Sequence, residues 1–366
     1  MSSEAYFHDV IAGRRRGLTA SLVRAALRFA SVGYGAFQWA KVSLYGSGLR
    51  RQIAVNRPVL VVGNLTMGGT GKTTTTVFIV NKLMEAGIRS GVILRGYRRK
   101  SGLPPLLVTD GAETLASVLE AGDEAALLAN SLPSHPVAVG TSRVDVARML
   151  IEQCEPNALV LDDGFGHLRL ARDADVVLVD ASHEIETDRI LPAGTLREPP
   201  SALRRATQVW ITHAELVDAD RVATLKHWLA GRAPGVAVVV TEHRTDKLRS
   251  LTGADTPPVG AKVLAMSGLG NPRSFEASLE RAGYDVVQAV FSDHHRYSDA
   301  DWERIRQQMA ETGAQHVITT EKDAVKLTAP PATINSVHVL GCELAIVDGQ
   351  EHVAALVEKV KSCLTQ

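Results

Sequence analysis

A glycine-rich run that joins an apolar stretch to a predicted helix is the feature with the clearest chemistry. It contains the residues Gly68, Gly69, Thr70, Gly71, Lys72, Thr73 and Thr74. The glycines allow backbone N–H groups to turn toward a phosphate at the N-terminus of the helix. Lys72 is then placed to reach the β- and γ-phosphates of a nucleotide, and the Thr73 hydroxyl to hold Mg²⁺. The strict pattern has a further glycine where this chain has Thr66, so the run is a variant phosphate-binding loop.

A pair of carboxylates follows a second apolar stretch. Asp162 and Asp163 come directly after residues 158–161. A nucleotide enzyme needs a carboxylate at the end of a strand beside the phosphate loop to organise Mg²⁺, so we predict that these two acids form the metal site. Capping of the following turn is the structural alternative. Asp180 ends another apolar run but has no acidic neighbour, and it ranks lower.

The elements that must position these groups alternate between strands and helices. The predicted strands are 58–63, 90–94, 136–139, 158–161, 176–180 and 208–211, and the predicted helices include 115–129 and 142–154. This alternation predicts a doubly wound parallel α/β sheet. After a turn-rich stretch that begins near residue 251, the pattern restarts with strands at 263–266, 285–290 and 316–319 and helices at 272–282 and 299–311. A second, smaller α/β lobe follows from that restart.

Residues 18–43 predict one amphipathic helix, because their apolar and small residues recur at three- and four-residue spacing. The uncharged stretch 29–40 is shorter than the roughly 20 residues that a membrane crossing needs. The first 57 residues hold nine Arg or Lys against two acids, a net charge of +7. A basic helix that also carries Phe29, Phe37 and Trp39 suits an anionic membrane surface. Packing against its own domain is the alternative.

The composition narrows the class of protein. The chain has 366 residues, 45% of them hydrophobic and 22% charged, which indicates a folded protein large enough for two lobes. Its formal net charge of zero argues against a nucleic-acid partner. The three cysteines are widely spaced and no secretory signal is recognisable, so we expect a reducing cytoplasmic location. No feature points to an obligate protein partner.

With both nucleotide motifs placed, the chain resembles the tetraacyldisaccharide 4'-kinase family from about residue 58 to residue 326. The matching pieces, in order, are residues 61–64 before the phosphate loop; Arg95-Gly96-Tyr97; Gly122-Asp123-Glu124; Asp162 to Phe165 with His167; Leu191 to Gly194 and Leu196 to Pro199; Asp293-His294-His295; and Thr320 to Lys326. The resemblance implies an ATP-dependent, Mg²⁺-requiring kinase of lipid A biosynthesis. Its substrate would be a lipid disaccharide at the cytoplasmic face of the inner membrane.

The resemblance also implies residue roles. Asp123 is expected to act as the base on the sugar hydroxyl, tuned by His294 with His295 as the substitute. Lys72 joins them in the catalytic set, while Arg95, Arg197 and Glu198 are expected to contact substrate or nucleotide phosphates. The implied organisation is a membrane-docking helix in residues 1–50, a P-loop kinase domain in 51–250 and a C-terminal lobe in 251–366.

This sequence departs from the family pattern at residues around the motifs and leaves a competing function open. The departures are Thr74, Leu94, Ala125 and Gly166, which stand where the family usually has Pro, Ser, Pro and Gln. None removes a proposed catalytic group. The alternative from another class is a nucleotide-switch, partitioning-type ATPase. Its variant loop usually carries a lysine where this chain has Met67. A kinase of a soluble metabolite would leave the N-terminal helix unexplained.

Overall fold

The computed structural model describes residues 15, 17–96, 103–269, 272–292, 295–327 and 330–364, without the side chains of Asp246, Lys247 and Ser274. The chain divides into two compact units, and each is assembled from separated segments. Unit 1 comprises residues 1–95, 142–242 and 346–366, and unit 2 comprises residues 96–141 and 243–345. The predicted boundaries at residues 50 and 250 stay a proposal.

Unit 1 is built on a parallel sheet. Its strands are β1 (Val59–Asn64), β2 (Ser90–Leu94), β5 (Ala158–Asp162), β6 (Ala174–Asp180), β7 (Gln208–Thr212) and the start of β8 (Ala237–Ser250), in the order β8-β7-β6-β1-β5-β2. Each neighbouring pair is parallel. β1, β2, β5 and β7 are buried at every residue, as in a sheet covered on both faces. The phosphate loop therefore follows a strand at the centre of this sheet.

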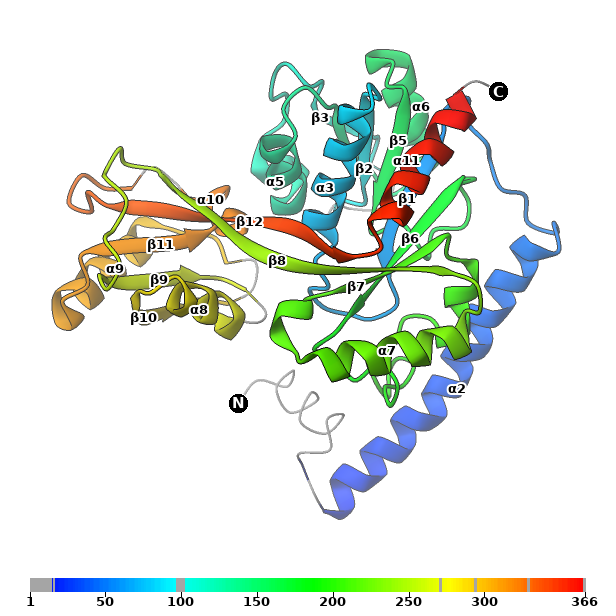
Figure 1. Ribbon diagram of the computed structural model, residues 1–366, viewed down its shortest axis with the longest axis horizontal. Helices are drawn as coiled ribbons and strands as arrows, with labels where there is room; N and C mark the ends of the chain where they lie inside the picture. Colours follow the sequence, from blue (N-terminus) through cyan, green and yellow to red (C-terminus); the bar gives the residue numbers. More distant parts are fainter. Residues whose placement is uncertain are drawn as a thin grey trace. The chain divides into compact units, whose positions relative to one another are not determined.

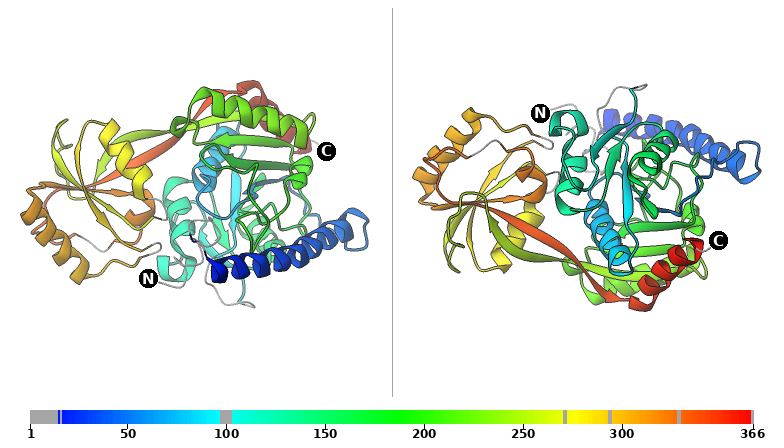
Figure 2. Two further views of the ribbon diagram at one scale, coloured as in Figure 1. Left: turned by 90° about the horizontal axis from the view of Figure 1, so that it is seen from below. Right: turned by 90° about the horizontal axis from the view of Figure 1, so that it is seen from above.

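The helices of unit 1 are α2 (Leu18–Gly46), α3 (Lys72–Glu85), α6 (Arg143–Cys154), α7 (Ala219–Arg232) and α11 (Gln350–Leu364), with short 3₁₀ turns at Pro200–Arg205 and Ala214–Leu216. Helix α2 lies along one side of this unit and leaves most of its residues exposed (Figures 1 and 2). No helix among the described residues, α2 included, is both long and apolar enough to cross a membrane.

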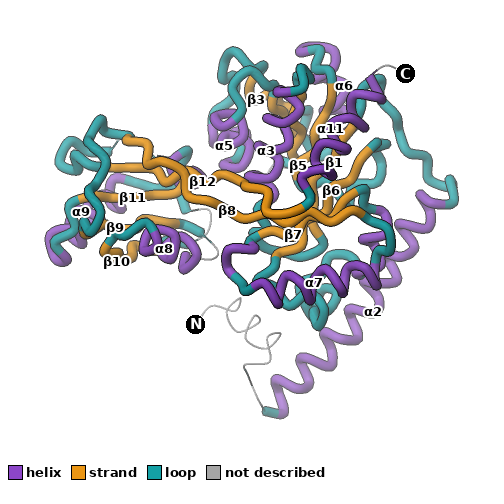
Figure 3. Tube along the Cα trace, in the orientation of Figure 1, coloured by secondary structure: helices purple, strands orange, loops and turns teal. Residues whose placement is uncertain are grey.

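Unit 2 has its own parallel strands β9 (Lys262–Ser267), β10 (Asp285–Val290), β11 (His316–Thr320) and β12 (Val337–Asp348), in the order β10-β9-β11-β12. It also contains α8 (Pro272–Arg281), α9 (Asp299–Thr312), α10 (Glu321–Ala324), α4 (Val118–Ala121), α5 (Asp123–Ser131) and the antiparallel pair β3 (Leu106–Thr109) and β4 (Val137–Val139). Two apolar clusters, around Trp302 and Phe275, form its core. The boundary between the units falls within both β8 and β12 (Figure 3).

The predicted α/β sheet is confirmed, but the predicted helix 115–129 is wrong in its continuity. Gly122 interrupts it with a positive φ of 92°, a conformation that glycine adopts without steric cost. Two helices result, α4 and α5, and Gly122 becomes the residue that precedes α5. The consequence for the site is that Asp123 stands at the first position of a helix rather than in its middle.

Candidate active site

The phosphate loop has the backbone that its glycines predict. Gly68 and Gly71 have φ values of 118° and 77°, and Gly71 directly precedes α3, so that Lys72 is the first residue of the helix. The Thr70 hydroxyl accepts a hydrogen bond from the Asn64 side chain at 2.9 Å. The Thr70 carbonyl accepts one from the Thr212 hydroxyl at 3.1 Å. The loop is thus fixed from β1 and β7 while its N–H groups and helix N-terminus are arranged as an anion site.

The predicted acid pair lies beside this loop. Strands β1 and β5 are neighbours, and Val62 is paired with Asp162, so Asp162 stands level with the end of the strand that enters the loop. The buried Asp162 carboxylate accepts a hydrogen bond from the Thr76 hydroxyl of α3 at 3.0 Å. Thr73 occupies the first turn of the same helix. The structure therefore brings the predicted metal ligands to one edge of the sheet, with oxygen donors suited to a hard cation.

Asp163 differs from Asp162 in exposure and partner. It has a left-handed backbone with φ of 52°, and its side chain is 38% exposed. Both of its carboxylate oxygens accept hydrogen bonds from the Arg197 guanidinium at 3.0 Å. Burial acts to raise the pKa of Asp163, but the charges of Lys72 and Arg197 outweigh it and hold that pKa below its usual value. Asp163 is therefore anionic and close to the lysine of the phosphate loop.

Arg197 connects this acid to the phosphate loop. Its backbone N–H donates to the Leu65 carbonyl at 2.6 Å, and the Met67 N–H donates to the Thr195 carbonyl at 2.8 Å. Thr66 forms an antiparallel bridge with Leu196. The segment that resembles the family's Leu-Arg-Glu-Pro motif thus runs along the entrance of the phosphate loop.

The neighbouring Glu198 has a different environment from the one expected. The residue is only 4% exposed, and its carboxylate forms an ion pair with Arg205 at 2.5 Å. Burial raises the pKa of Glu198, and the charges of Arg205 and Lys41 offset part of that rise. This buried pair holds the loop in place, and direct contact of Glu198 with substrate stays a prediction.

Two arginines that the sequence did not single out lie around the acids. Arg143 is 6% exposed at the first position of α6, where a cation is unfavourable to the helix dipole. Burial lowers its pKa to about 10, helped by the charge of Arg95 and opposed by those of Asp163 and Asp162. That position, a charged arginine opening a helix after a buried strand, was the available signal. The exposed Arg95, which is predicted to bind substrate, is near enough to Arg143 for its charge to lower the pKa of Arg143.

Arg172 holds the loop that follows the acid pair. Its guanidinium donates to the carbonyls of Phe165 at 3.0 Å and His167 at 2.8 Å, and it pairs with Asp175 at 3.0 Å. Burial, together with the charges of Arg143 and Arg172, lowers the pKa of His167 to about 4. His167 is therefore a neutral imidazole at physiological pH, unsuited to donate a proton as an acid.

The predicted base belongs to unit 2. Asp123 is half-buried in the first turn of α5, against which α10 of the Thr320–Lys326 motif packs. Its predicted partner His294 lies outside the described residues. The substitute, His295, has its Nε2 atom 3.1 Å from Asp301, a residue that also caps α9 through Ser298. His295 thus has a structural partner of its own.

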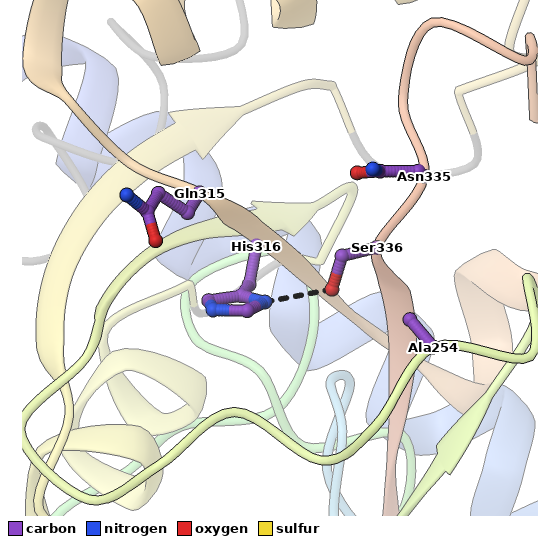
Figure 4. A pocket seen from close by; sticks show the side chains of 5 residues that line it. All are labelled: Ala254, Gln315, His316, Asn335 and Ser336. Carbon is purple, nitrogen blue, oxygen red and sulfur yellow. Dashed lines mark hydrogen bonds between the residues drawn. The ribbon is translucent and has the colours of Figure 1, made fainter.

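Unit 2 also contains an open pocket, lined by Ala254, Gln315, His316, Asn335 and Ser336 (Figure 4). The Nδ1 atom of His316 points toward the Ser336 hydroxyl at 2.7 Å, and that hydroxyl lies 3.0 Å from His338. Burial lowers the pKa of both histidines. None of the predicted site residues lines this pocket.

Comparisons with known proteins agree with one another. A family model described as Tetraacyldisaccharide-1-P 4'-kinase matches residues 23–361. The tetraacyldisaccharide 4'-kinase of Anaeromyxobacter dehalogenans (strain 2CP-C) is 39% identical over 318 residues, covering 86% of this chain and 84% of that one. That of Geobacter sulfurreducens is 35% identical over 367 residues, covering 97% and 99%. The crystal structure of Aquifex aeolicus LpxK in complex with ATP matches with a TM-score of 0.75 and 27% identity, covering 93% and 99%.

Proposed function

Because this chain belongs to the tetraacyldisaccharide-1-P 4'-kinase family, we propose that it transfers the γ-phosphate of ATP to the 4'-hydroxyl of a tetraacyldisaccharide 1-phosphate in lipid A biosynthesis. The observation that carries this proposal is the pairing of Val62 with Asp162. That pairing supports a metal site of Asp162 and Asp163 beside a phosphate loop that ends in Lys72. The competing nucleotide-switch reading has no comparable support.

The nucleotide binds at the N-terminus of α3. Backbone N–H groups from Gly68 to Gly71 face the phosphates, and Lys72 neutralises the charge between the β- and γ-phosphates. Thr73, Asp162 and Asp163 would hold Mg²⁺, which would supply charge neutralisation at the transferred group. Phosphoryl transfer asks little covalent chemistry of a protein, so positioning and charge account for most of the rate.

Asp123 accepts the proton of the sugar hydroxyl as the γ-phosphate is transferred. An aspartate is a weak base, and His294 is proposed to orient it or to take up its proton.

Helix α2 is proposed to dock on an anionic membrane at the cytoplasmic face. Large apolar side chains are exposed along it: Leu18, Leu22, Phe29, Val32, Phe37 and Trp39 are between 64% and 83% exposed. Arg24 and Arg28 stand on the same helix and complement anionic headgroups. A lipid disaccharide held in the bilayer is then within reach of an enzyme that binds the surface.

The test is transfer of label from γ-labelled ATP to detergent-dispersed tetraacyldisaccharide 1-phosphate by wild type, Asp123→Asn and Glu124→Gln. The wild type labels the lipid. Asp123→Asn lowers kcat by roughly 10²-fold or more, because the base is lost. Glu124→Gln, a matched change one residue along the same helix turn, keeps most of the activity.

Two outcomes contradict the proposal in different ways. ATP consumed without labelled lipid in the wild type rejects the lipid-kinase function and favours the ATPase. Labelled lipid at equal rates from wild type and Asp123→Asn keeps the function but rejects Asp123 as the base.

A further inference from the structure

Helix α2 carries a stripe of polar side chains on the face toward its own unit and large apolar side chains on its exposed face. Ser31, Gln38 and Lys41 are spaced by seven and three residues, which places them on one side of the helix. Ser31 and Gln38 contact the backbone of the segment between β6 and the 3₁₀ turn at Pro200–Arg205, and Lys41 contacts the loop after β5. The Ser31 hydroxyl donates to the Ile190 carbonyl at 2.7 Å and accepts from the Ala193 N–H at 3.0 Å.

Gln38 reaches the residue that organises the entrance of the site. Its Nε2 donates to the Arg197 carbonyl at 3.1 Å and to the Tyr34 hydroxyl at 2.7 Å. Arg197 already contacts Leu65 through its N–H and Asp163 through its side chain. The helix, the phosphate loop and the acid pair therefore meet at one residue, and Gln38 is the contribution of the helix.

Lys41 completes a set of contacts on the loop after the acids. Arg172 holds the carbonyls of Phe165 and His167, and the Lys41 ammonium holds the carbonyl between them, that of Gly166, at 2.7 Å. Three successive carbonyls of this loop are thus bound by cations. Arg172, which is near in sequence, binds two of these carbonyls. Lys41 of helix α2, 125 residues away from Gly166, binds the third.

These contacts are poorly explained as packing alone. Gln38 is 9% exposed, and a buried amide is costly unless it makes specific hydrogen bonds. Burial lowers the pKa of Lys41, so the contact with Gly166 is kept against a desolvation cost. Apolar side chains at both positions would serve a helix whose only task was to anchor the protein.

We propose that Gln38 and Lys41 are positioning residues for the magnesium–nucleotide site, so that helix α2 is a structural part of that site as well as a membrane-docking element. They act through the Arg197 backbone and the Gly166 backbone on the segments that carry Asp163. The inference rests on the proposed role of Asp163 in holding Mg²⁺. One consequence is that deleting residues 1–45 removes these contacts along with the membrane anchor, so a deletion cannot separate the two roles.

Single substitutions on opposite faces of the helix do separate them. We compare Gln38→Met and Lys41→Met with Trp39→Ala, whose side chain is 71% exposed. A fluorescent ATP analogue is titrated with and without Mg²⁺, and binding to vesicles containing anionic lipid is measured by sedimentation. In the inner-face variants the increase in nucleotide affinity on adding Mg²⁺ is about tenfold smaller than in wild type, a loss typical of residues that orient metal ligands. Their Mg²⁺-free affinity and their vesicle binding stay within about twofold of wild type, the spread expected of a distant site.

Trp39→Ala gives the reverse result, with weaker vesicle binding and an unchanged response to Mg²⁺. Lys41→Arg retains most of the Mg²⁺ response because a guanidinium also donates to a carbonyl. Thermal melting checks that both inner-face variants are folded. The inference is overturned if the folded variants respond to Mg²⁺ as wild type does, or if their Mg²⁺-free affinity falls as much as their affinity in the presence of Mg²⁺. If Trp39→Ala binds vesicles normally while Gln38→Met loses the Mg²⁺ response, the membrane proposal fails and this inference stands.

Discussion

Each unit holds an aspartate paired with a basic side chain, and the two pairs differ in what surrounds them. In unit 1, Asp163 and Arg197 are 38% and 37% exposed at the edge of a sheet. In unit 2, Asp323 and Lys326 are 0% and 6% exposed, 2.7 Å apart. Both pairs belong to motifs of the family resemblance. Their surroundings indicate a structural task for the buried pair and a ligand-binding task for the exposed pair.

The buried pair receives further contacts from its own unit. The Asp323 carboxylate also accepts hydrogen bonds from the Gly268 N–H at 3.0 Å and the Thr320 hydroxyl at 2.8 Å. Burial, with the charge of Asp323 nearby, raises the pKa of Tyr297. A charge held in this way fixes a turn, whereas the half-exposed Asp163 leaves room for a ligand. A shared motif therefore does not imply a shared site.

The largest effect on catalysis is expected at the half-exposed pair. Asp163→Asn removes one of the two proposed anionic metal ligands, and we expect it to lower kcat by about 10²- to 10³-fold, the usual loss when one electrostatic group of a site is removed. Its thermal melting temperature stays near that of wild type, because an exposed ion pair adds little stability. A large drop in melting temperature with normal activity would reverse the comparison.

The buried pair should show the opposite pattern. Lys326→Met leaves Asp323 as an uncompensated buried charge, and the free energy of unfolding falls by about 3–5 kcal/mol. Denaturant unfolding with a fluorescence probe in unit 2 measures this, and binding of ATP to the protein that remains folded stays normal. Arg306→Met, which breaks the exposed Arg306–Glu303 pair, is the control and leaves the midpoint unchanged. An unchanged midpoint for Lys326→Met would show that the buried pair is dispensable.

Local sequence order was enough to propose the phosphate loop and the acid pair of the candidate site. The phosphate loop and Asp162 follow from apolar strands that end in glycines or acids, because a strand and the turn after it are set by neighbouring residues. Arg143 and Gln38 were missed because the groups around them lie far away in sequence, whereas Arg172 was missed although its partners are three to seven positions away. Gln38 meets Arg197 across 159 positions of sequence.

The strands of the fold also divide into those that local sequence predicts and those that it does not. The strands of the parallel sheet were predicted within one to two residues, but β8 and β12 were not predicted, although each has an apolar half. Both pass from one unit to the other, so their environment changes partway along. A pattern that assumes one environment for each strand does not detect them.

The smallest effect, one on stability, is expected at a third charged cluster, which lies beside the phosphate loop. His213 has Nδ1 3.4 Å from Glu215 and Nε2 3.9 Å from Asp180, at the end of β7. Burial acts to lower its pKa, but the hydrogen bond with Glu215, the charge of Asp180 and a hydrogen bond at the Gly69 backbone raise it above its usual value. Protonated His213 therefore supports both the cluster and the loop.

A raised pKa in the folded state gives a stabilisation that is complete below the unfolded pKa, about 6.5, and is lost as the pH rises through the higher folded value. We expect wild type to exceed His213→Asn in free energy of unfolding at pH 5.5 by about 1 kcal/mol or less, the scale of a partly exposed charge cluster. The difference disappears toward alkaline pH. Melting curves of both proteins from pH 5.5 to 9 measure it. A difference that grows with pH would mean that His213 is neutral in the folded protein and that Asn64 and Thr212 hold the loop without its charge.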